Sequence, residues 1–377
     1  MKRFLYFAAV VILMTTSGLN AMAMADTAES ACLMNAVTGD VIFEKNADTP
    51  MPMASTTKIM TLITALENSD PEEIVTVPHE ATLEEGSSAY IDEGASISMR
   101  ELFYGLMLNS GNDAAVAIAC HISGSEAAFA DKMNELADRI GLSNTHFRNA
   151  NGLDEEGHYT TARDLAKLTR YALHNEMFRE IVSTRVHTTS FTKVNGEEQS
   201  FDYYNHNKLL GDLQGCIGVK TGYTTADGRC LVSATERGGA TYIAVTLNCQ
   251  NDWDEHREMH EFAHTSTRFV NVINAGDCVD IAECNGIKCR LLAESGFTVP
   301  VNGDAGRDFD LRIRLPHLIN MPLNMHEKIG TLEIFDGDSC LGGVDIIAEE
   351  EFVPSGKASV RMNFWYSMII ILRNMLG

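Results

Sequence analysis

The chain has 377 residues, of which 45% are hydrophobic and 21% are charged, a composition typical of folded globular proteins. Its length predicts two domains with targeting segments at the ends. The formal net charge of −23 argues against nucleic acid as a partner, because an acidic surface repels phosphates.

The N-terminal residues have the pattern of a secretory signal peptide. A basic start, Lys2 and Arg3, precedes an apolar run over residues 4–14 that is too short to span a bilayer. Cleavage after Ala23 or Ala25 fits the small-residue rule equally well. We therefore expect residues 1–25 to be a leader and the mature chain to be exported.

The next segments predict a hairpin followed by several helices. Ala31–Asn35 and Val41–Glu44 flank a Thr-Gly-Asp turn, which is typical of a β-hairpin. Apolar residues then recur at helical spacing over Ser55–Leu66, so Ser55 is expected at a helix start. Further helices are expected on both sides of a polar loop at Asn144–Tyr159, namely over Ser98–Leu108, Asp113–Ile122, Glu126–Ile140 and Ala162–His174.

From residue 216 the pattern changes to strands. Strands are expected over Ile217–Thr221, Arg229–Thr235 and Ala240–Asn248. Strands near both ends with helices between them predict a sheet in which the first and last strands are adjacent in space. A helix over Asp254–Ala275 is then expected to close a domain that spans residues 26–275.

The remaining chain predicts a second domain and a membrane-binding segment. Residues 276–353 contain short alternating apolar segments, such as Ile329–Phe335, and indicate a small all-β domain. Residues 354–377 predict an amphipathic helix in which Trp365, Ile369 and Leu372 share the apolar face. We expect this helix to lie on the membrane surface, although the same pattern suits packing on the β-domain.

Nine cysteines, an odd number, exclude a complete set of disulfides within the chain. Cys120, Cys230 and Cys249 lie in apolar segments and are expected to be small buried hydrophobic residues. A disulfide or a metal site stays open for three cysteines that lie closer together but lack a paired C-x-x-C spacing, Cys278, Cys284 and Cys289.

Residues that can carry chemistry are concentrated in three short motifs. The first is Ser55-Thr56-Thr57-Lys58, in which the i,i+3 spacing puts the Ser55 hydroxyl and the Lys58 amine on the same helix face. A serine hydroxyl needs a base to become a nucleophile, and a lysine is such a base when burial and nearby cations lower its pKa. The helix N-terminus adds positive potential where an oxyanion would form.

The other two motifs suit the transfer of protons and the binding of substrate. Ser110-Gly111-Asn112 interrupts two helices, so its hydroxyl can relay a proton and its amide can hold a peptide carbonyl. Lys220-Thr221-Gly222 ends a strand, where lysine and threonine can bind a carboxylate and glycine lets a ligand approach the backbone. Each motif alone is weak, but their order and context together point to a serine hydrolase.

With these motifs, the chain resembles the low-molecular-mass penicillin-binding proteins, the D-alanyl-D-alanine carboxypeptidase family. The resemblance spans about residues 32–269 and is carried by Ala54–Met60, Leu106–Ala115, His158–Ala166 and Gly218–Thr224. It implies the α/β fold shared with serine β-lactamases, an antiparallel sheet flanked by helices, followed by a small all-β domain. It also implies removal of the terminal D-alanine from peptidoglycan stem pentapeptides at the outer face of the cytoplasmic membrane, inhibition by β-lactams, and no cofactor.

The resemblance further implies roles for individual residues. Ser55 would be acylated by the penultimate D-alanine, Lys58 would be the general base and Ser110 would shuttle protons. Lys220 and Thr221 would recognise the terminal carboxylate. The oxyanion hole would be formed by the backbone N–H groups of Ser55 and of Tyr223, the residue after Gly222, and Asn112 would hold a substrate carbonyl. His206 stands where some family members carry an arginine, so the second contact to the carboxylate is left undecided.

Three other functions are weighed against this one. A serine β-lactamase needs a further base, and the loop 149–158 lacks the Glu-x-x-x-Asn pattern of those enzymes. A zinc metallopeptidase is suggested by His260, Glu261 and His264, which satisfy H-E-x-x-H on a predicted helix but have no motif-defined third ligand. A non-enzymatic peptidoglycan-binding protein is disfavoured because the whole serine set is present.

Overall fold

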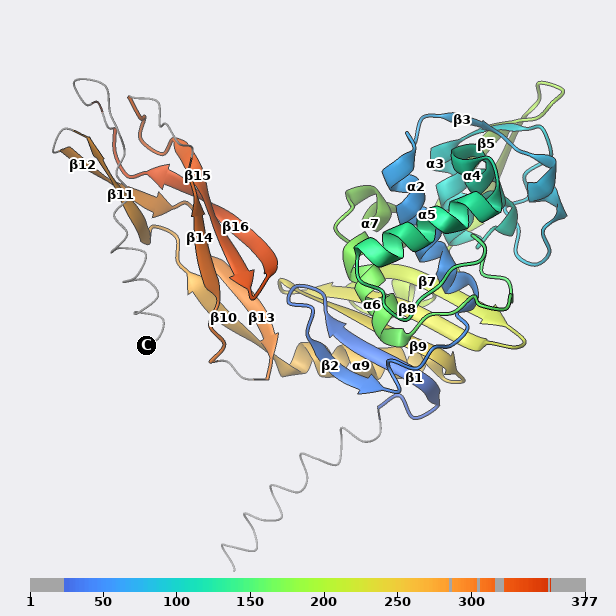
Figure 1. Ribbon diagram of the computed structural model, residues 1–377, viewed down its shortest axis with the longest axis horizontal. Helices are drawn as coiled ribbons and strands as arrows, with labels where there is room; N and C mark the ends of the chain where they lie inside the picture. Colours follow the sequence, from blue (N-terminus) through green and yellow to red (C-terminus); the bar gives the residue numbers. More distant parts are fainter. Residues whose placement is uncertain (1–23, 285–286, 304–305, 316–321, 352, 354–377) are drawn as a thin grey trace, which may run out of the picture. The chain divides into compact units, whose positions relative to one another are not determined.

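The computed structural model describes residues 24–284, 287–303, 306–315, 322–351 and 353. The chain divides into two units, Met1–Thr265 and Ser266–Gly377, and each is described by itself (Figure 1). The expected leader and the expected C-terminal helix lie almost entirely outside the described residues. In the part of the chain that is described, no helix is both long and apolar enough to cross a membrane.

The first unit is built on a five-stranded antiparallel sheet with the order β2-β1-β9-β8-β7. Its strands are β1 (Ala28–Asn35), β2 (Val41–Lys45), β7 (Cys216–Thr224), β8 (Gly228–Arg237) and β9 (Ala240–Cys249). Cys32 of β1 lies opposite Val245 of β9, which confirms that the first and last strands of the domain are neighbours. β7 therefore forms one edge of the sheet, the edge that carries the third motif.

Helices cover both faces of this sheet, and most of them gather in a helical region (Figure 1). These helices agree with the sequence prediction within a few residues, except that the predicted first helix is divided at Lys58. They are α2 (Lys58–Asn68), α3 (Met99–Leu108), α4 (Asn112–Ser123), α5 (Glu126–Arg139) and α6 (Ala162–Ala172). The N-termini of α3, α5 and α6 are capped by the side chains of Ser98, Ser125 and Thr161, which accept backbone N–H groups.

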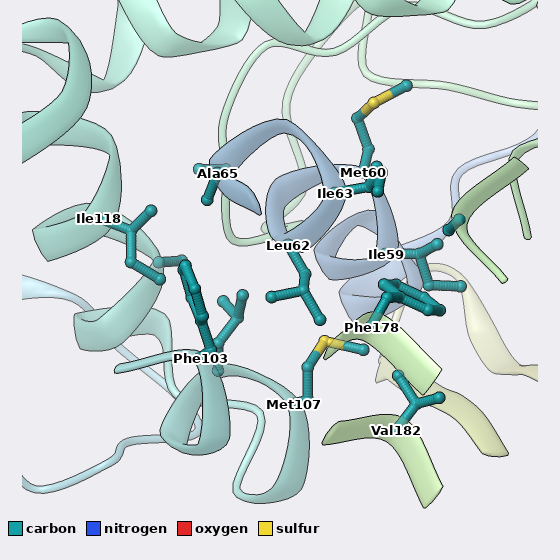
Figure 2. Close-up of a cluster of buried hydrophobic side chains, with 14 of the residues drawn as sticks. Ile59, Met60, Leu62, Ile63, Ala65, Phe103, Met107, Ile118, Phe178 and Val182 are labelled. Atoms are coloured by element: carbon teal, nitrogen blue, oxygen red, sulfur yellow. The ribbon is translucent and has the colours of Figure 1, made fainter. Parts of the chain in front are cut away.

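Helix α2 forms the centre of the helical core. Its residues from Lys58 to Ala65 are all buried, so this part of the helix is enclosed on every side rather than on one face. Figure 2 shows Leu62 directed toward Phe103 and Met107 of α3, with Phe178 of the short helix α7 (Glu176–Ser183) nearby. The rigid packing around α2 fixes the position of its N-terminal end.

The sequence analysis missed a second sheet in this unit. It has the order β3-β4-β5-β6 and contains β3 (Ile74–Thr76), β4 (Ser96–Ser98), β5 (Val186–Thr192) and β6 (Glu198–Tyr204). β5 and β6 are rich in threonine, serine and acidic residues and bury few side chains, so they lack the apolar alternation that identifies a strand. The one-turn helix α8 (Leu209–Asp212) leads from this sheet to β7.

The helix predicted over Asp254–Ala275 is wrong in its second half. Helix α9 spans Asp252–Ser266, and the chain then forms β10 (Thr267–Ile273), which pairs with β13 (Phe297–Asn302). The β-branched residues Thr267, Val270, Val272 and Ile273 favour a strand over a helix. The second unit consequently begins at Ser266, before the boundary expected from the sequence.

The second unit is all-β, as expected. Its five-stranded sheet has the order β11-β12-β16-β15-β14 and encloses a core that includes Val279, Leu291, Leu332 and Ile346. The strands are β11 (Cys278–Cys284), β12 (Ile287–Ala293), β14 (Asp310–Arg314), β15 (Lys328–Asp336) and β16 (Ser339–Ala348).

The cysteines with described side chains carry free thiols. Cys230 and Cys249 are buried, as the sequence predicted, whereas Cys120 is only half-buried. Cys278 and Cys289 are free, and the side chain of Cys284 lies outside the described residues. Of the disulfides that the sequence left open among Cys278, Cys284 and Cys289, the one between Cys278 and Cys289 is therefore not formed.

Candidate active site

The nucleophile candidate lies in a tight turn in front of α2 rather than in the helix itself. Ser55 belongs to a 3-10 turn over Ala54–Thr57, and the regular helix begins at Lys58. The sequence periodicity did not separate the two, because a 3-10 turn at a helix start has nearly the same spacing. The first amides of a helix have no acceptor within it, so the Ser55 N–H is available to a ligand.

Lys58 is completely buried and is held by three oxygen atoms. Its Nζ lies 3.0 Å from Ser55 Oγ, 2.7 Å from Asn112 Oδ1 and 2.5 Å from the carbonyl oxygen of Asn151. Burial, and then the positive charge of Lys220, hold the pKa of Lys58 well below its usual range. A neutral amine has two N–H bonds. With both donated to Asn112 and Asn151, its lone pair faces the Ser55 hydroxyl.

The second and third motifs meet directly. Ser110 lies between α3 and α4 in the left-handed region, with φ of 59°, which a serine adopts only when its surroundings hold it there. Its Oγ accepts a hydrogen bond of 3.0 Å from Lys220 Nζ, which also donates to the Thr221 carbonyl at 2.8 Å. Burial lowers the pKa of Lys220 to about 7. Two lysines with lowered pKa values are thus connected to two serine hydroxyls.

Strand β7 passes close to the nucleophile turn at Gly222. A Cβ atom on this residue would lie 3.1 Å from the backbone nitrogens of Ser55 and Thr56, which is tighter than ordinary contact. Only glycine lets the edge strand approach the turn so closely. The following residue, Tyr223, has a side chain that is 67% exposed and stands at the rim.

A cleft of about 340 Å³ opens over these groups. The predicted residues Ser55, Ser110, Thr221, Gly222 and Tyr223 line it, together with residues from other elements, Ser87, His206, Lys208, Arg229, Asp252 and Trp253. The three remaining predicted residues, Lys58, Asn112 and Lys220, are buried and bonded to that lining. The structure therefore brings every predicted site residue into one place.

Basic residues gather beside Thr221 in the wall of the cleft. They are His206, Lys208 and Arg229. Partial burial, and then the charge of Lys220, lower the pKa of His206, so this ring favours the neutral form. Arg229 forms an ion pair of 3.0 Å with Asp252 and lies over the Trp253 ring at 5.7 Å.

Sequence reasoning missed two residues that hold parts of this site in place. Asn151 supplies the carbonyl that holds Lys58, and its side-chain amide donates to Glu84 at 2.9 Å. Asp113 accepts from Ala89 N and Ser88 Oγ, both at 2.7 Å, and so fixes the loop that carries Ser87 into the cleft. Asn151 acts through its backbone, which leaves no signal in the residue type. Asp113 follows the second motif directly, and that position was the available signal.

The zinc-like helix motif has a structural role in the described chain. His256 and His260 of α9 are fully buried against the main sheet. Both ring nitrogens of His260 are occupied, by Ser233 Oγ at 2.7 Å and Thr235 Oγ1 at 2.8 Å. Glu261 instead pairs with Arg237 at 2.6 Å. Rings saturated by hydroxyl partners have no nitrogen lone pair directed at a common ion, so the zinc hypothesis lacks a site here.

Comparison with known proteins agrees with this geometry. The profile of the family described as Peptidase_S11, D-alanyl-D-alanine carboxypeptidase, matches residues 18–251. The chain belongs to this family. It is 29% identical over 347 residues to the D-alanyl-D-alanine carboxypeptidase DacF of Bacillus subtilis, and the match covers 88% of each chain.

Solved structures give the same result. A mutant of the Streptomyces K15 DD-transpeptidase superposes with a TM-score of 0.61 at 33% identity, covering 63% of this chain and 98% of that one. The D-alanyl-D-alanine carboxypeptidase DacD of Francisella tularensis has a TM-score of 0.61 at 26% identity, covering 87% of this chain and 94% of that one.

These relatives confirm the fold and the activity expected from the sequence. The protein is a serine-type peptidase that acts in peptidoglycan metabolism and has the penicillin-binding protein fold. The relatives give no support to a serine β-lactamase or a zinc metallopeptidase.

Proposed function

We propose that this protein removes the terminal D-alanine from peptidoglycan stem pentapeptides through an acyl-enzyme on Ser55. The observation that carries the proposal is the distance of 3.0 Å between Ser55 Oγ and the Nζ of a lysine whose pKa is strongly lowered by burial. The neutral Lys58 amine takes the hydroxyl proton as Oγ attacks the penultimate D-alanine carbonyl. The oxyanion is stabilised by the N–H groups of Ser55 and Tyr223.

The second half of acylation uses the other lysine. Ser110 passes a proton to the leaving D-alanine amine, and Lys220, 3.0 Å from Ser110 Oγ, supplies it. After D-alanine has left, Lys58 holds the Ser55 proton and Lys220 has lost one, so a proton passes from Lys58 to Lys220 by way of water and both lysines regain their starting charge. Water then attacks the ester with neutral Lys58 as the base, and the proton that Lys58 takes returns to Ser55 Oγ as the ester bond breaks and the shortened peptide leaves. Asn112 holds Lys58 through its Oδ1 and donates from its other amide atom to the Glu85 carbonyl. We therefore assign Asn112 to orienting Lys58 rather than to binding a substrate carbonyl.

The terminal carboxylate of the substrate is proposed to lie between Thr221 and the positive wall of the cleft. Thr221, the residue after Lys220 in β7, is half-buried. Arg229 and Lys208 line the cleft beside it. His206, which favours the neutral form, contributes a hydrogen bond rather than a charge. A carboxylate in a cleft with this lining gains from charge-assisted hydrogen bonds.

A defined substrate tests the chemistry. Wild-type protein incubated with a synthetic stem pentapeptide should release one equivalent of free D-alanine, and Ser55→Ala should release none. Mass spectrometry of the penicillin-treated protein should find the adduct on the Ser55 peptide alone. Because one structural relative is a DD-transpeptidase, an added acceptor amine should be included. Transfer of the acyl group to that amine in preference to water would replace carboxypeptidase by transpeptidase activity.

We further propose that the protein works at the outer face of the cytoplasmic membrane. The support is the sequence pattern of residues 1–25 and the amphipathic pattern of residues 354–377. The mature chain should sediment with vesicles, and a chain that ends at Val353 should remain in the supernatant. Equal sedimentation of the two chains would remove the membrane role from the C-terminal segment.

A further inference from the structure

The nucleophile turn contains a residue in an unfavourable conformation. Ala54, directly before Ser55, is fully buried and has φ of 49°, in the left-handed region that residues with a Cβ rarely adopt. Such a conformation persists only where the surroundings hold it in place. The contacts that hold Ala54 therefore bear on the geometry of Ser55.

The Ala54 carbonyl group is held by a side chain. Thr57 Oγ1 donates to the Ala54 oxygen at 2.8 Å, and both groups are buried. Gly152 packs against the same oxygen. A Cβ atom at this position would lie 2.2 Å from the oxygen, so only glycine fits there. On the other side of Ala54, its N–H group hydrogen-bonds to the buried Asp227. Both peptide groups that flank Ala54 are thus held.

A histidine from another loop orients Thr57. His158 Nε2 lies 2.8 Å from Thr57 Oγ1, and His158 Nδ1 accepts the backbone N–H of Arg148 at 3.1 Å. Because Nδ1 accepts, the proton of the neutral ring must be on Nε2, which donates to Thr57. Thr57 has a single hydroxyl proton, and with His158 as donor that proton is directed to the Ala54 carbonyl. The chain of hydrogen bonds therefore has one direction, from His158 through Thr57 to Ala54.

The planarity of the peptide bond carries this effect to the active site. The Ala54 carbonyl and the Ser55 N–H belong to one peptide group, and in a trans peptide the two bonds point in opposite directions. Fixing the carbonyl therefore fixes the direction of the Ser55 N–H. We propose that His158 and Thr57 are positioning residues that aim the Ser55 N–H at the oxyanion formed during acylation. This inference rests on the proposed function of Ser55.

The test compares variants that break the hydrogen bonds with variants that keep them. Thr57→Val and His158→Leu remove a hydroxyl and a ring donor, whereas Thr57→Ser and His158→Gln keep a group that can donate. The exposed His174, which lies outside the site, gives the matched control His174→Leu. The assay measures kcat and KM for D-alanine release from a stem pentapeptide, together with the melting temperature of each variant.

A misdirected oxyanion donor should lower kcat and leave KM nearly unchanged, because it acts in the transition state. Removal of a whole oxyanion donor lowers kcat about 100- to 1,000-fold, so its misdirection in Thr57→Val and His158→Leu should lower kcat by about 10- to 100-fold. Thr57→Ser and His158→Gln should recover most of this loss. A peptide boronic acid, which forms a tetrahedral anion on Ser55, should bind more weakly to the two broken variants by a similar factor.

Two results would overturn the inference. One is a kcat in Thr57→Val and His158→Leu within about twofold of wild type. The other is a loss that follows the melting temperature and is not restored by Thr57→Ser or His158→Gln. The double variant Thr57→Val/His158→Leu adds a further requirement. Because the two residues act through one chain of hydrogen bonds, the double variant should lose no more kcat than either single variant. If wild-type protein itself released no D-alanine, the proposed function would fail instead, independently of these variants.

Discussion

Two buried lysines lie at the centre of the site, and the proposed chemistry depends on which of them carries a proton. Lys58 and Lys220 are each almost fully buried, and each contacts a serine hydroxyl at 3.0 Å. Burial disfavours the ammonium form of both, and the charge of Lys220 lowers the pKa of Lys58 further. In the proposed mechanism Lys58 therefore loses its proton first and is the general base.

This pair predicts a bell-shaped pH profile for kcat/KM. Activity should rise with pH as Lys58 becomes neutral, and it should fall above pH of about 7 as Lys220, with a pKa of about 7, loses its proton. The two values belong to the coupled pair rather than to single residues. In Lys220→Arg the guanidinium stays charged, so the falling limb should move to higher pH even if the maximum is lower. A falling limb that stays in place would assign it to another group.

At the scale of elements, α9 is joined to the main sheet by a continuous ladder of hydrogen bonds. Hydroxyl and imidazole groups alternate in it at distances of 2.6 to 3.0 Å, in the order Thr246, His256, Ser233, His260, Thr235 and His264. A neutral imidazole donates from one nitrogen and accepts at the other, so the ladder is complete only when the rings are uncharged. Burial lowers the pKa of His256 to about 3 and that of His260 well below its usual value.

The ladder predicts that the folded catalytic unit loses stability in mild acid. Below pH 6.5 the unfolded chain binds protons at these histidines and the folded chain does not, so stability falls as the pH falls toward the folded pKa values. For each fully buried histidine this amounts to about 1 kcal/mol between pH 6 and pH 5. His260→Gln should reduce the loss by about that amount, and the exposed His174→Gln should leave it unchanged.

Urea unfolding at the two pH values measures this loss. Trp253, at the start of α9, reports on the catalytic unit when the other tryptophan is replaced in Trp365→Phe. An equal loss in wild type and His260→Gln would contradict the role of the ladder.

A cavity created in the core around helix α2 should strongly lower the stability of the first unit. Leu62 is fully buried between α2 and α3, as Figure 2 shows, and its neighbours are held by other helices and cannot close around a smaller side chain. Leu62→Ala should lower the free energy of unfolding by about 2–5 kcal/mol. Leu83→Ala, at a side chain that is 64% exposed, should change it by less than about 0.5 kcal/mol. Similar values for the two variants in urea unfolding would show that α2 is not the centre of the core.

For the whole molecule, the first unit should be sufficient for acylation. All residues of the site lie before Ser266, and the similar Streptomyces chain is covered over 98% of its length by 63% of this one. A chain that ends at residue 266 should therefore acylate with penicillin within about threefold of the full-length rate. The rate of adduct formation on Ser55 measures this. A loss of much more than tenfold would mean that the second unit takes part in the site.

The sequence was sufficient for the parts of the fold with strong periodicity. The helices at 99–139 and the strands from 216 to 249 have strong apolar patterns and were predicted closely. The polar hairpin of β5 and β6 and the strand Thr267–Ile273 were not, because burial and pairing with distant strands decide them.

The active site was predictable to the extent that side chains carry it. Residue type and spacing predicted a chemical role for four side chains, namely Ser55, Lys58, Ser110 and Lys220. The Asn151 carbonyl and the left-handed Ala54 act through the backbone, and a backbone role is not visible in residue type.

The order of the sheet also has a consequence for how the protein is made. Strand β1, the first to be synthesised, lies between β2 and β9, and β9 ends at Cys249. Until β9 is available for pairing, β1 has one unpaired side, and the third motif in β7 becomes available only shortly before β9. A chain that ends before β7 therefore contains Ser55 and Lys58 but lacks Lys220, so it has the proposed nucleophile without the residue proposed to bind the substrate. Such a chain also exposes an open strand edge, which is prone to pair with other chains until β9 arrives.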